Sequence, residues 1–107
     1  MTRRPADSPM IERKRRPRMP GKLLQEYYLA PRGLTIAGFA RATKLSRKHV
    51  SNIVHGRAAI SPDTAVRFAK VLDTAPQFWL NLQNAVDIHD ARKRLEDGPE
   101  LSVIAAE

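Results

Sequence analysis

The residues of this chain that are best equipped for chemistry are cations, and they gather in one stretch of the sequence. Six Lys and Arg residues and no carboxylate lie between Glu26 and Asp63. A surface without acidic residues presents positive potential to a polyanion, because nothing on it neutralises the cations internally. Neutralising phosphates and releasing their counterions supplies most of the non-specific affinity of DNA-binding proteins. The position and sign of these charges therefore favour a nucleic acid as the partner.

The chain has few residues that could form disulfides, bind a metal or act as a catalytic nucleophile. The chain has no Cys, which excludes disulfides and thiolate zinc sites. Its histidines, His49, His55 and His89, do not fall at metal-ligand spacing, and no nucleophile motif is present. We therefore expect no enzymatic activity, no metal and no cofactor.

Length and charge define the class of protein. The 107 residues carry a formal net charge of +8, and the pI is near 10.6. This length fits one small domain with tails, and the pI exceeds the value of about 9 that is typical of nucleic-acid-binding domains. No apolar run approaches the ~18 residues of a membrane span, and the first residues lack the apolar stretch of a signal peptide. The sequence predicts a cytoplasmic protein without a membrane partner.

Charge divides the chain into three parts. Residues 1–19 hold seven Lys and Arg residues against two carboxylates, together with several prolines. This composition predicts a disordered basic arm, because it cannot bury enough surface to offset the entropy of ordering. The arm would either remain a solvated tail or follow DNA phosphates or a minor groove. Residues 20–95 form the domain, and residues 96–107 are expected to be an acidic, flexible tail that stays away from DNA.

Apolar residues recur at helical spacing through the domain and predict an all-α fold of five helices. The first covers residues 20–30 and is expected to bury Leu23, Leu24, Tyr27 and Tyr28. The next three begin at the N-caps Thr35, Ser46 and Ser61, and the second of the five ends near Thr43. The fifth runs from Thr74 to Ala91, where Thr74-x-x-Gln77 matches a capping box. Phe78 and Trp79 are expected to anchor the core rather than to stack on a ligand, and some apolar surface is expected to remain for a second chain.

The helix that begins at Ser46 separates its side chains into two faces when they are placed at about 100° per residue. Val50, Ile53 and, at the flank, Val54 point one way, and the other face holds Arg47, Lys48, Ser51, Asn52 and His55. That face offers hydrogen-bond donors and no bulky apolar residue, which suits base edges in a major groove. A solvated surface helix would show the same pattern. The short helix and turn before it, and Arg57 just after it, favour a helix-turn-helix over about residues 35–55.

Four segments of the sequence carry a resemblance to a known family: PGKLLQEYYLAPRGLT, LSRKHVSNIVHGRAAIS, DTAVRFAKVLDT, and QFWLNLQ with Asp87 after it. With them, the chain from Pro20 to about Asp90 resembles the HigA (VapI-type) antitoxins of the Cro/cI-like helix-turn-helix class. The resemblance implies a bacterial, dimeric antitoxin that binds operator DNA and represses its own operon. It also implies a partner protein, a HigB toxin that cleaves mRNA as RelE-type RNases do.

The resemblance assigns roles to residues by their positions in the motif. Base-reading positions fall on Arg47, Lys48, Ser51 and Asn52, and DNA-backbone positions fall on Thr35, Arg41, Lys44, Ser46, His55 and Arg57. Lys44 stands where the family usually has glycine, so a left-handed backbone there costs on the order of 1 kcal/mol. Thr43 stands where the residue is usually apolar. We therefore expect the turn before the third helix to be remodelled.

Three classes of function remain open. The first is the antitoxin and autorepressor, and the second is a stand-alone Cro-like regulator without a toxin. The third is an RNA-binding or nucleoid-type protein, which normally stacks exposed aromatic residues on bases; the aromatic residues here fall on predicted core stripes. A basic toxin is expected to contact acidic patches, either around Glu26 or from Asp87 and Asp90 into residues 96–100.

Overall fold

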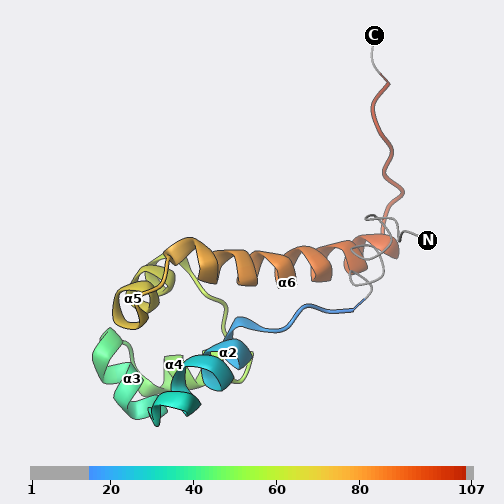
Figure 1. Ribbon diagram of the computed structural model, residues 1–107. Helices are drawn as coiled ribbons and strands as arrows, with labels where there is room; N and C mark the ends of the chain where they lie inside the picture. Colours follow the sequence, from blue (N-terminus) through green and yellow to red (C-terminus); the bar gives the residue numbers. More distant parts are fainter. Residues whose placement is uncertain (1–14, 106–107) are drawn as a thin grey trace, which may run out of the picture.

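The computed structural model describes residues 15–105 and is helical throughout its folded part (Figure 1). Its elements are α2 (Pro20–Leu23), the π-helix η1 (Leu24–Leu29), the 3₁₀-helix η2 (Ala30–Arg32), α3 (Ile36–Thr43), α4 (Arg47–Val54), α5 (Pro62–Leu72) and α6 (Pro76–Glu96). The long helix α6 forms one side of the molecule, and α5 packs against its first half (Figure 1). The helices α3 and α2 both pack on α4 at the other side. The prediction of an all-α fold is confirmed over the residues that the structure describes.

The first predicted helix is helical but not a uniform α-helix. The α-helical pattern lasts only for α2 and widens into η1 before it tightens into η2. Pro31 cannot donate the backbone hydrogen bond that would continue the helix, and Gly33 ends it with a φ of 65°. The wider turn of a π-helix also shifts the side chains around the axis. Tyr27, which was expected to be buried, is therefore 57% exposed, with the Arg18 guanidinium 5.7 Å from the centre of its ring.

Three of the predicted N-caps are confirmed. The Thr35 hydroxyl accepts a hydrogen bond from the N–H of Gly38 at 2.9 Å, and the Ser46 hydroxyl accepts one from the N–H of His49 at 3.0 Å. Ser61 caps α5 in the same way. Each hydroxyl thus satisfies one of the free amides in the first turn of its helix. The starts of α3 and α4, which frame the candidate site, follow from local sequence alone.

The predicted capping box at Thr74 is wrong. The N-cap of α6 is Ala75, which makes no side-chain cap, and the helix begins with Pro76 and runs beyond Ala91 to Glu96. The Thr74 hydroxyl accepts a hydrogen bond from Trp79 Nε1 at 2.8 Å instead. Trp79 is fully buried, and a buried indole N–H requires an acceptor. The Thr74 hydroxyl therefore does not cap the N-terminus of α6.

The core gathers around the aromatic side chains of α3, α5 and α6. The rings of Phe68 and Trp79 lie 5.4 Å apart and nearly perpendicular, and Phe39 meets Phe68 at 5.0 Å. All three are almost completely buried. Trp79 is therefore a core anchor, as predicted, whereas Phe78 lies at the margin with 38% of its surface exposed.

The two ends of the described chain behave differently. Residues 15–19 run without regular secondary structure from α2 toward the second half of α6 (Figure 1). There Arg16 donates two hydrogen bonds to the carboxylate of Asp90, at 3.0 and 2.9 Å. The end of the predicted arm is thus joined to the domain, while residues 1–14 and 106–107 lie outside the described residues. Beyond α6, residues 97–105 form no helix or strand. None of the helices in residues 15–105 is long and apolar enough to cross a membrane.

Candidate nucleic-acid interface

The two faces of α4 are separated as its sequence predicts. Val50 and Ile53 are buried in the core, and Arg47 and Lys48 are exposed in the first turn. Ser51 and Asn52 are half-buried further along the helix. The four predicted base-reading residues therefore lie on the solvent side of one short helix whose other side is fixed. Their contact with bases stays a prediction.

The end of α4 carries two further predicted contact residues. The Nδ1 of His55 donates to the backbone carbonyl oxygen of Ser51 at 2.8 Å, because a carbonyl can only accept. The other ring nitrogen of a neutral His55 is then an acceptor. Beyond it, the N–H groups of Arg57 and Ala58 donate to the carbonyl oxygen of Asn52 at 2.7 and 3.2 Å. These bonds hold the backbone of Arg57 against the end of α4, with its side chain exposed.

Cations from three elements surround a hollow between α3 and α4. The hollow has a volume of about 320 Å³ and is lined by Ala37, Ala40, Arg41, Lys44, Leu45 and Arg47. The alanines leave room between the helices, and the three cations line its edges. A concave surface with one sign of charge concentrates potential and attracts a phosphate. The predicted backbone-contact residues Arg41 and Lys44 thus lie beside Arg47, the first of the predicted base-reading residues. Thr35 is exposed at the start of α3, where its hydroxyl acts as the N-cap.

The turn between α3 and α4 keeps the usual backbone despite its unusual sequence. Lys44 has a φ of 62° and lies in the left-handed region. The N–H of Leu45 donates to the carbonyl of Ala40 at 3.0 Å and that of Lys44 to Arg41 at 3.3 Å, the pattern of a Schellman motif. The expected remodelling of the turn is therefore wrong. Thr43 is buried, and its hydroxyl donates to the carbonyl oxygens of Phe39 and Ala40.

Arg67 of α5 supports this turn and was not identified from the sequence. Its Nη1 donates to the carbonyl oxygen of Thr43 at 2.9 Å and lies 3.4 Å from that of Lys44. Its Nε donates to Asp63 Oδ2 at 2.8 Å. The sequence offers only the pairing of Asp63 with Arg67 one helical turn later. The contact with the turn spans 24 residues of sequence.

Gly21 supports the opposite end of α4. A Cβ atom at this position would lie 1.8 Å from the carbonyl oxygen of Ile53 and 2.8 Å from the Cα of Val54. Real Cβ atoms do not approach backbone this closely. Gly21, in the first of the segments that carry the family resemblance, lets α2 touch the backbone of α4.

Gln83 joins α6 to the loop that follows α4. Its side-chain Oε1 accepts a hydrogen bond from the N–H of Ile60 at 2.9 Å, and its Nε2 donates to Asp87 Oδ1 at 2.9 Å. The side chain is buried, and a buried amide is stable only when its donors and acceptors are paired. The final Gln of the FWLNLQ segment and the Asp that follows it therefore form one hydrogen-bonded unit.

The acidic residues expected to meet a toxin are partly neutralised by the chain itself. Glu26 pairs with Arg18 and Lys22, and Asp90 pairs with Arg16. The hydrogen bonds from the Arg16 guanidinium lower the pKa of Asp90 to about 2, because they favour the charged carboxylate.

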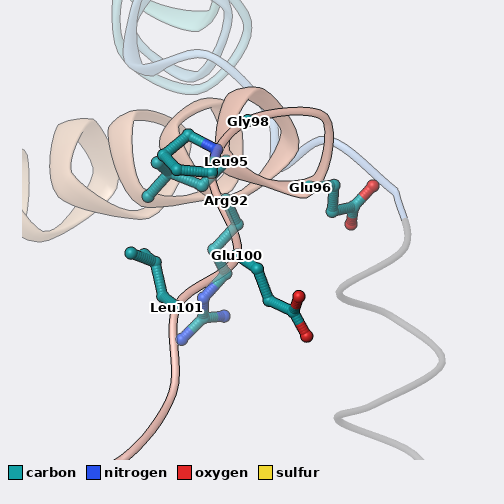
Figure 2. A pocket seen from close by; sticks show the side chains of 7 residues that line it. Arg92, Leu95, Glu96, Gly98, Glu100 and Leu101 are labelled. Atoms are coloured by element: carbon teal, nitrogen blue, oxygen red, sulfur yellow. The ribbon is translucent and has the colours of Figure 1, made fainter.

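Further acidic residues lie at the end of α6 and beyond it. A hollow of about 670 Å³ is lined there by Arg92, Leu95, Glu96, Gly98, Pro99, Glu100 and Leu101. Figure 2 shows the Arg92 side chain extending from the helix between Leu101 and Glu100, while Glu96 points away from them. The charge of this hollow is therefore mixed rather than purely acidic.

Comparisons with known proteins agree with this geometry. Residues 24–79 match the family model described as Helix-turn-helix. The chain is 39% identical over 88 residues to antitoxin HigA-1 of Vibrio cholerae, across 82% of this chain and 83% of that protein. It is 43% identical over 76 residues to an uncharacterized HTH-type transcriptional regulator of Haemophilus influenzae, across 71% of each chain.

Solved structures show the same fold. The antitoxin GraA in complex with its operator superposes with a TM-score of 0.76 at 37% identity, across 85% of this chain and 95% of GraA. Fold and sequence thus agree over the helical domain. This chain belongs to the HigA family of Cro/cI-type helix-turn-helix proteins.

Proposed function

We propose that this protein is the antitoxin of a type II toxin–antitoxin pair and represses its own operon as an operator-bound dimer. It also binds and neutralises a HigB/RelE-like toxin that cleaves mRNA. The observation that carries the proposal is the exposed face of α4, where Arg47 and Lys48 follow a capped start beside the cationic hollow of α3. The similarity to GraA, which was solved with its operator, supports the DNA-binding half. The similarity to antitoxin HigA-1 supports the toxin-binding half.

Base reading begins at the first turn of α4. Arg47 and Lys48 enter the major groove first, and Arg or Lys donating to guanine O6 and N7 is the commonest specific contact in such complexes. Asn52 lies further along the same face and reads adenine or bridges to a base through water. Arg41, Lys44 and Arg57 contact phosphates on either side of the groove and fix the register without reading sequence.

The working unit is a two-fold dimer. One recognition helix covers too few base pairs for useful specificity, so two copies read an inverted repeat whose half-sites lie one helical turn, about 34 Å, apart. An operator of this kind contacts the same cationic face on both copies. The dimer contact therefore leaves α4 uncovered.

Base-reading and phosphate-contacting residues should respond differently to truncation. Arg47→Ala or Asn52→Ala should weaken operator binding by about 1–3 kcal/mol and narrow the gap between the affinities for operator and for random duplex. Arg57→Ala should weaken both by a similar factor and lower the slope of log affinity against log salt by about one. Competition binding of labelled operator against random duplex measures both quantities. An equal loss for the two duplexes with Arg47→Ala would remove this residue from the base-reading set.

The toxin contact has to overcome repulsion between two basic proteins. The antitoxin carries a net charge of +8, and an RNase that binds RNA is basic for the same electrostatic reason. Contact on acidic surface away from α4 avoids this repulsion. At Glu26 and Asp90 a basic toxin competes with Arg18 and Arg16 of the chain itself.

Co-expression with the neighbouring reading frame tests the toxin-binding half. The neighbouring product, a basic protein of about a hundred residues, should arrest growth alone, and the antitoxin should restore growth and co-purify with it. Because the contact lies away from α4, the complex should still bind operator DNA. A neighbouring product that is harmless and does not co-purify would instead support a stand-alone Cro-like regulator. The Haemophilus influenzae relative, an uncharacterized HTH-type transcriptional regulator, fits that second function.

A further inference from the structure

The point where the chain leaves α3 for α4 is clamped by one side chain of a third helix. The guanidinium of Arg67 donates to the carbonyl oxygen of Thr43 at 2.9 Å and lies 3.4 Å from that of Lys44. Asp63, one turn earlier on α5, accepts from Arg67 Nε at 2.8 Å. The carboxylate fixes the direction of the planar guanidinium fork, so the clamp has a defined geometry.

Arg67 supplies hydrogen-bond donors that the backbone of the turn between α3 and α4 does not provide. The carbonyls at a helix C-terminus need partners from outside the helix. The Schellman hydrogen bonds use the carbonyls of Ala40 and Arg41 and leave those of Thr43 and Lys44 for Arg67. The left-handed conformation of Lys44 is also unfavourable for a residue with a Cβ atom. Such a conformation persists only when its surroundings hold it in place.

The clamp lies very close to the base-reading residues along the chain. Only Leu45 and Ser46 separate Lys44 from Arg47, the first residue of α4. A change in the backbone of the turn therefore changes the angle at which α4 leaves it. Hydrogen bonds to base edges tolerate displacements of only about 0.5 Å. Contacts between long, flexible cations and phosphates tolerate much more, because they depend mainly on charge.

We propose that Arg67 is a positioning residue for operator recognition: by clamping the carbonyls of Thr43 and Lys44, it sets the tilt of α4 and thereby the fit of Arg47 to the bases. This inference rests on the proposed operator binding and adds a residue outside the predicted DNA-contacting set. Arg67 acts through the turn and does not contact DNA. Its guanidinium is engaged by Asp63 and by the turn, and only 37% of the side chain is exposed.

Arg67→Met tests the proposal, because methionine keeps much of the side-chain volume and removes every donor. The probes are a duplex that the wild-type protein enriches from a random-sequence library and a scrambled duplex of the same composition. We expect affinity for the enriched duplex to fall about tenfold and affinity for the scrambled duplex to change by less than about twofold. The salt slope of binding should stay constant, because no phosphate contact is lost.

Lys70→Met is the matched control. Lys70 is an exposed cation on the same helix α5, so its removal changes the net charge equally and leaves the turn intact. The ratio of the two affinities should not change in this variant. A tenfold fall in the ratio with Lys70→Met would show that long-range charge, rather than the clamp, determines recognition, and would overturn the proposal.

Two further variants keep the test decisive if Arg67→Met is poorly folded. Asp63→Asn retains the guanidinium and removes the carboxylate that directs it, so the affinity ratio should fall by about twofold to fivefold. Adding Lys44→Gly to Arg67→Met removes the strain of the left-handed residue. Because Lys44 is itself a proposed phosphate contact, both affinities should fall in the double variant, but their ratio should recover above that of Arg67→Met alone.

Three further results would overturn the assignment of the clamp. If Arg67→Met lowers both affinities equally and reduces the salt slope by about one, Arg67 contacts a phosphate directly. If the melting temperature falls while the affinity ratio is unchanged, Arg67 stabilises the fold without positioning α4. If Asp63→Asn leaves the ratio unchanged in a folded protein, the carboxylate does not direct the clamp. Failure of the proposed function looks different, because the wild-type protein would then enrich no sequence from the library.

Discussion

Gly21→Ala should destabilise the protein by about 3 kcal/mol, although alanine is the better helix former. Helix propensity alone predicts a gain of about 1 kcal/mol for this substitution. The new Cβ, however, would meet the carbonyl oxygen of Ile53 at 1.8 Å and the carbonyl carbon at 2.6 Å. These are backbone atoms of α4, which cannot rotate aside as the end of a side chain can. Relief of the clash has to separate α2 from α4, and overpacking of this kind typically costs 1–3 kcal/mol or more.

Urea denaturation followed by far-UV circular dichroism measures the effect of Gly21→Ala. Gly98→Ala is the matched control, because the nearest atom to its added Cβ, the carbonyl oxygen of Arg94, lies at an ordinary 3.5 Å. That variant should change the free energy of unfolding by less than about 0.5 kcal/mol. Equal stability of Gly21→Ala and wild type would contradict the close approach of α2 to α4.

Trp79→Ala should lower the free energy of unfolding by about 3–5 kcal/mol, at least as much as Gly21→Ala. Trp79 is fully buried, and its ring contacts Tyr28, Phe68 and Phe78 at centroid distances of 5.0 to 5.4 Å. Truncation leaves a cavity among these rings and removes the hydrogen bond from Nε1 to Thr74. A loss of this size is a large part of the total stability of a small domain. Much of the Trp79→Ala protein should therefore be unfolded at 37 °C.

Phe78→Ala provides the comparison on the neighbouring residue. Phe78 is 38% exposed, so its removal forfeits less buried area and opens no closed cavity. We expect a loss of about 1 kcal/mol. Thermal unfolding followed by circular dichroism measures both variants, because Trp79 is the single Trp of the chain and its fluorescence disappears with it. Similar losses for the two substitutions would show that Phe78 is part of the closed core.

The features that the sequence predicted well are local. Thr35, Ser46 and Ser61 cap their helices because each hydroxyl serves an amide three residues ahead. The two faces of α4 follow from helical spacing in the same way. The prediction at Thr74 was wrong because the burial of Trp79, five residues along the chain, makes its indole compete for the same hydroxyl. A capping pattern does not report which neighbouring side chain becomes buried in the fold and then needs an acceptor.

The contacts that hold α4 in place were the least predictable feature of the candidate site. The clamp from Arg67 reaches the turn across 24 residues, and Gly21 meets Ile53 across an even longer interval of sequence. Neither contact produces a periodicity or a residue spacing in the sequence from which it could be predicted. The segments that carry the family resemblance include Gly21 and Arg67, but the resemblance gave neither residue a role. Packing in three dimensions supplies both explanations.

All the supports of α4 described above act on its backbone or its buried face. Arg67 holds the carbonyls before the helix, Gly21 lies against the carbonyl of Ile53, and the N–H of Arg57 binds the carbonyl of Asn52. None of these contacts uses the side chains of Arg47 or Lys48. Those side chains can therefore be exchanged at little cost to folding, so the exposed face of α4 can change its chemistry while the helix keeps its position.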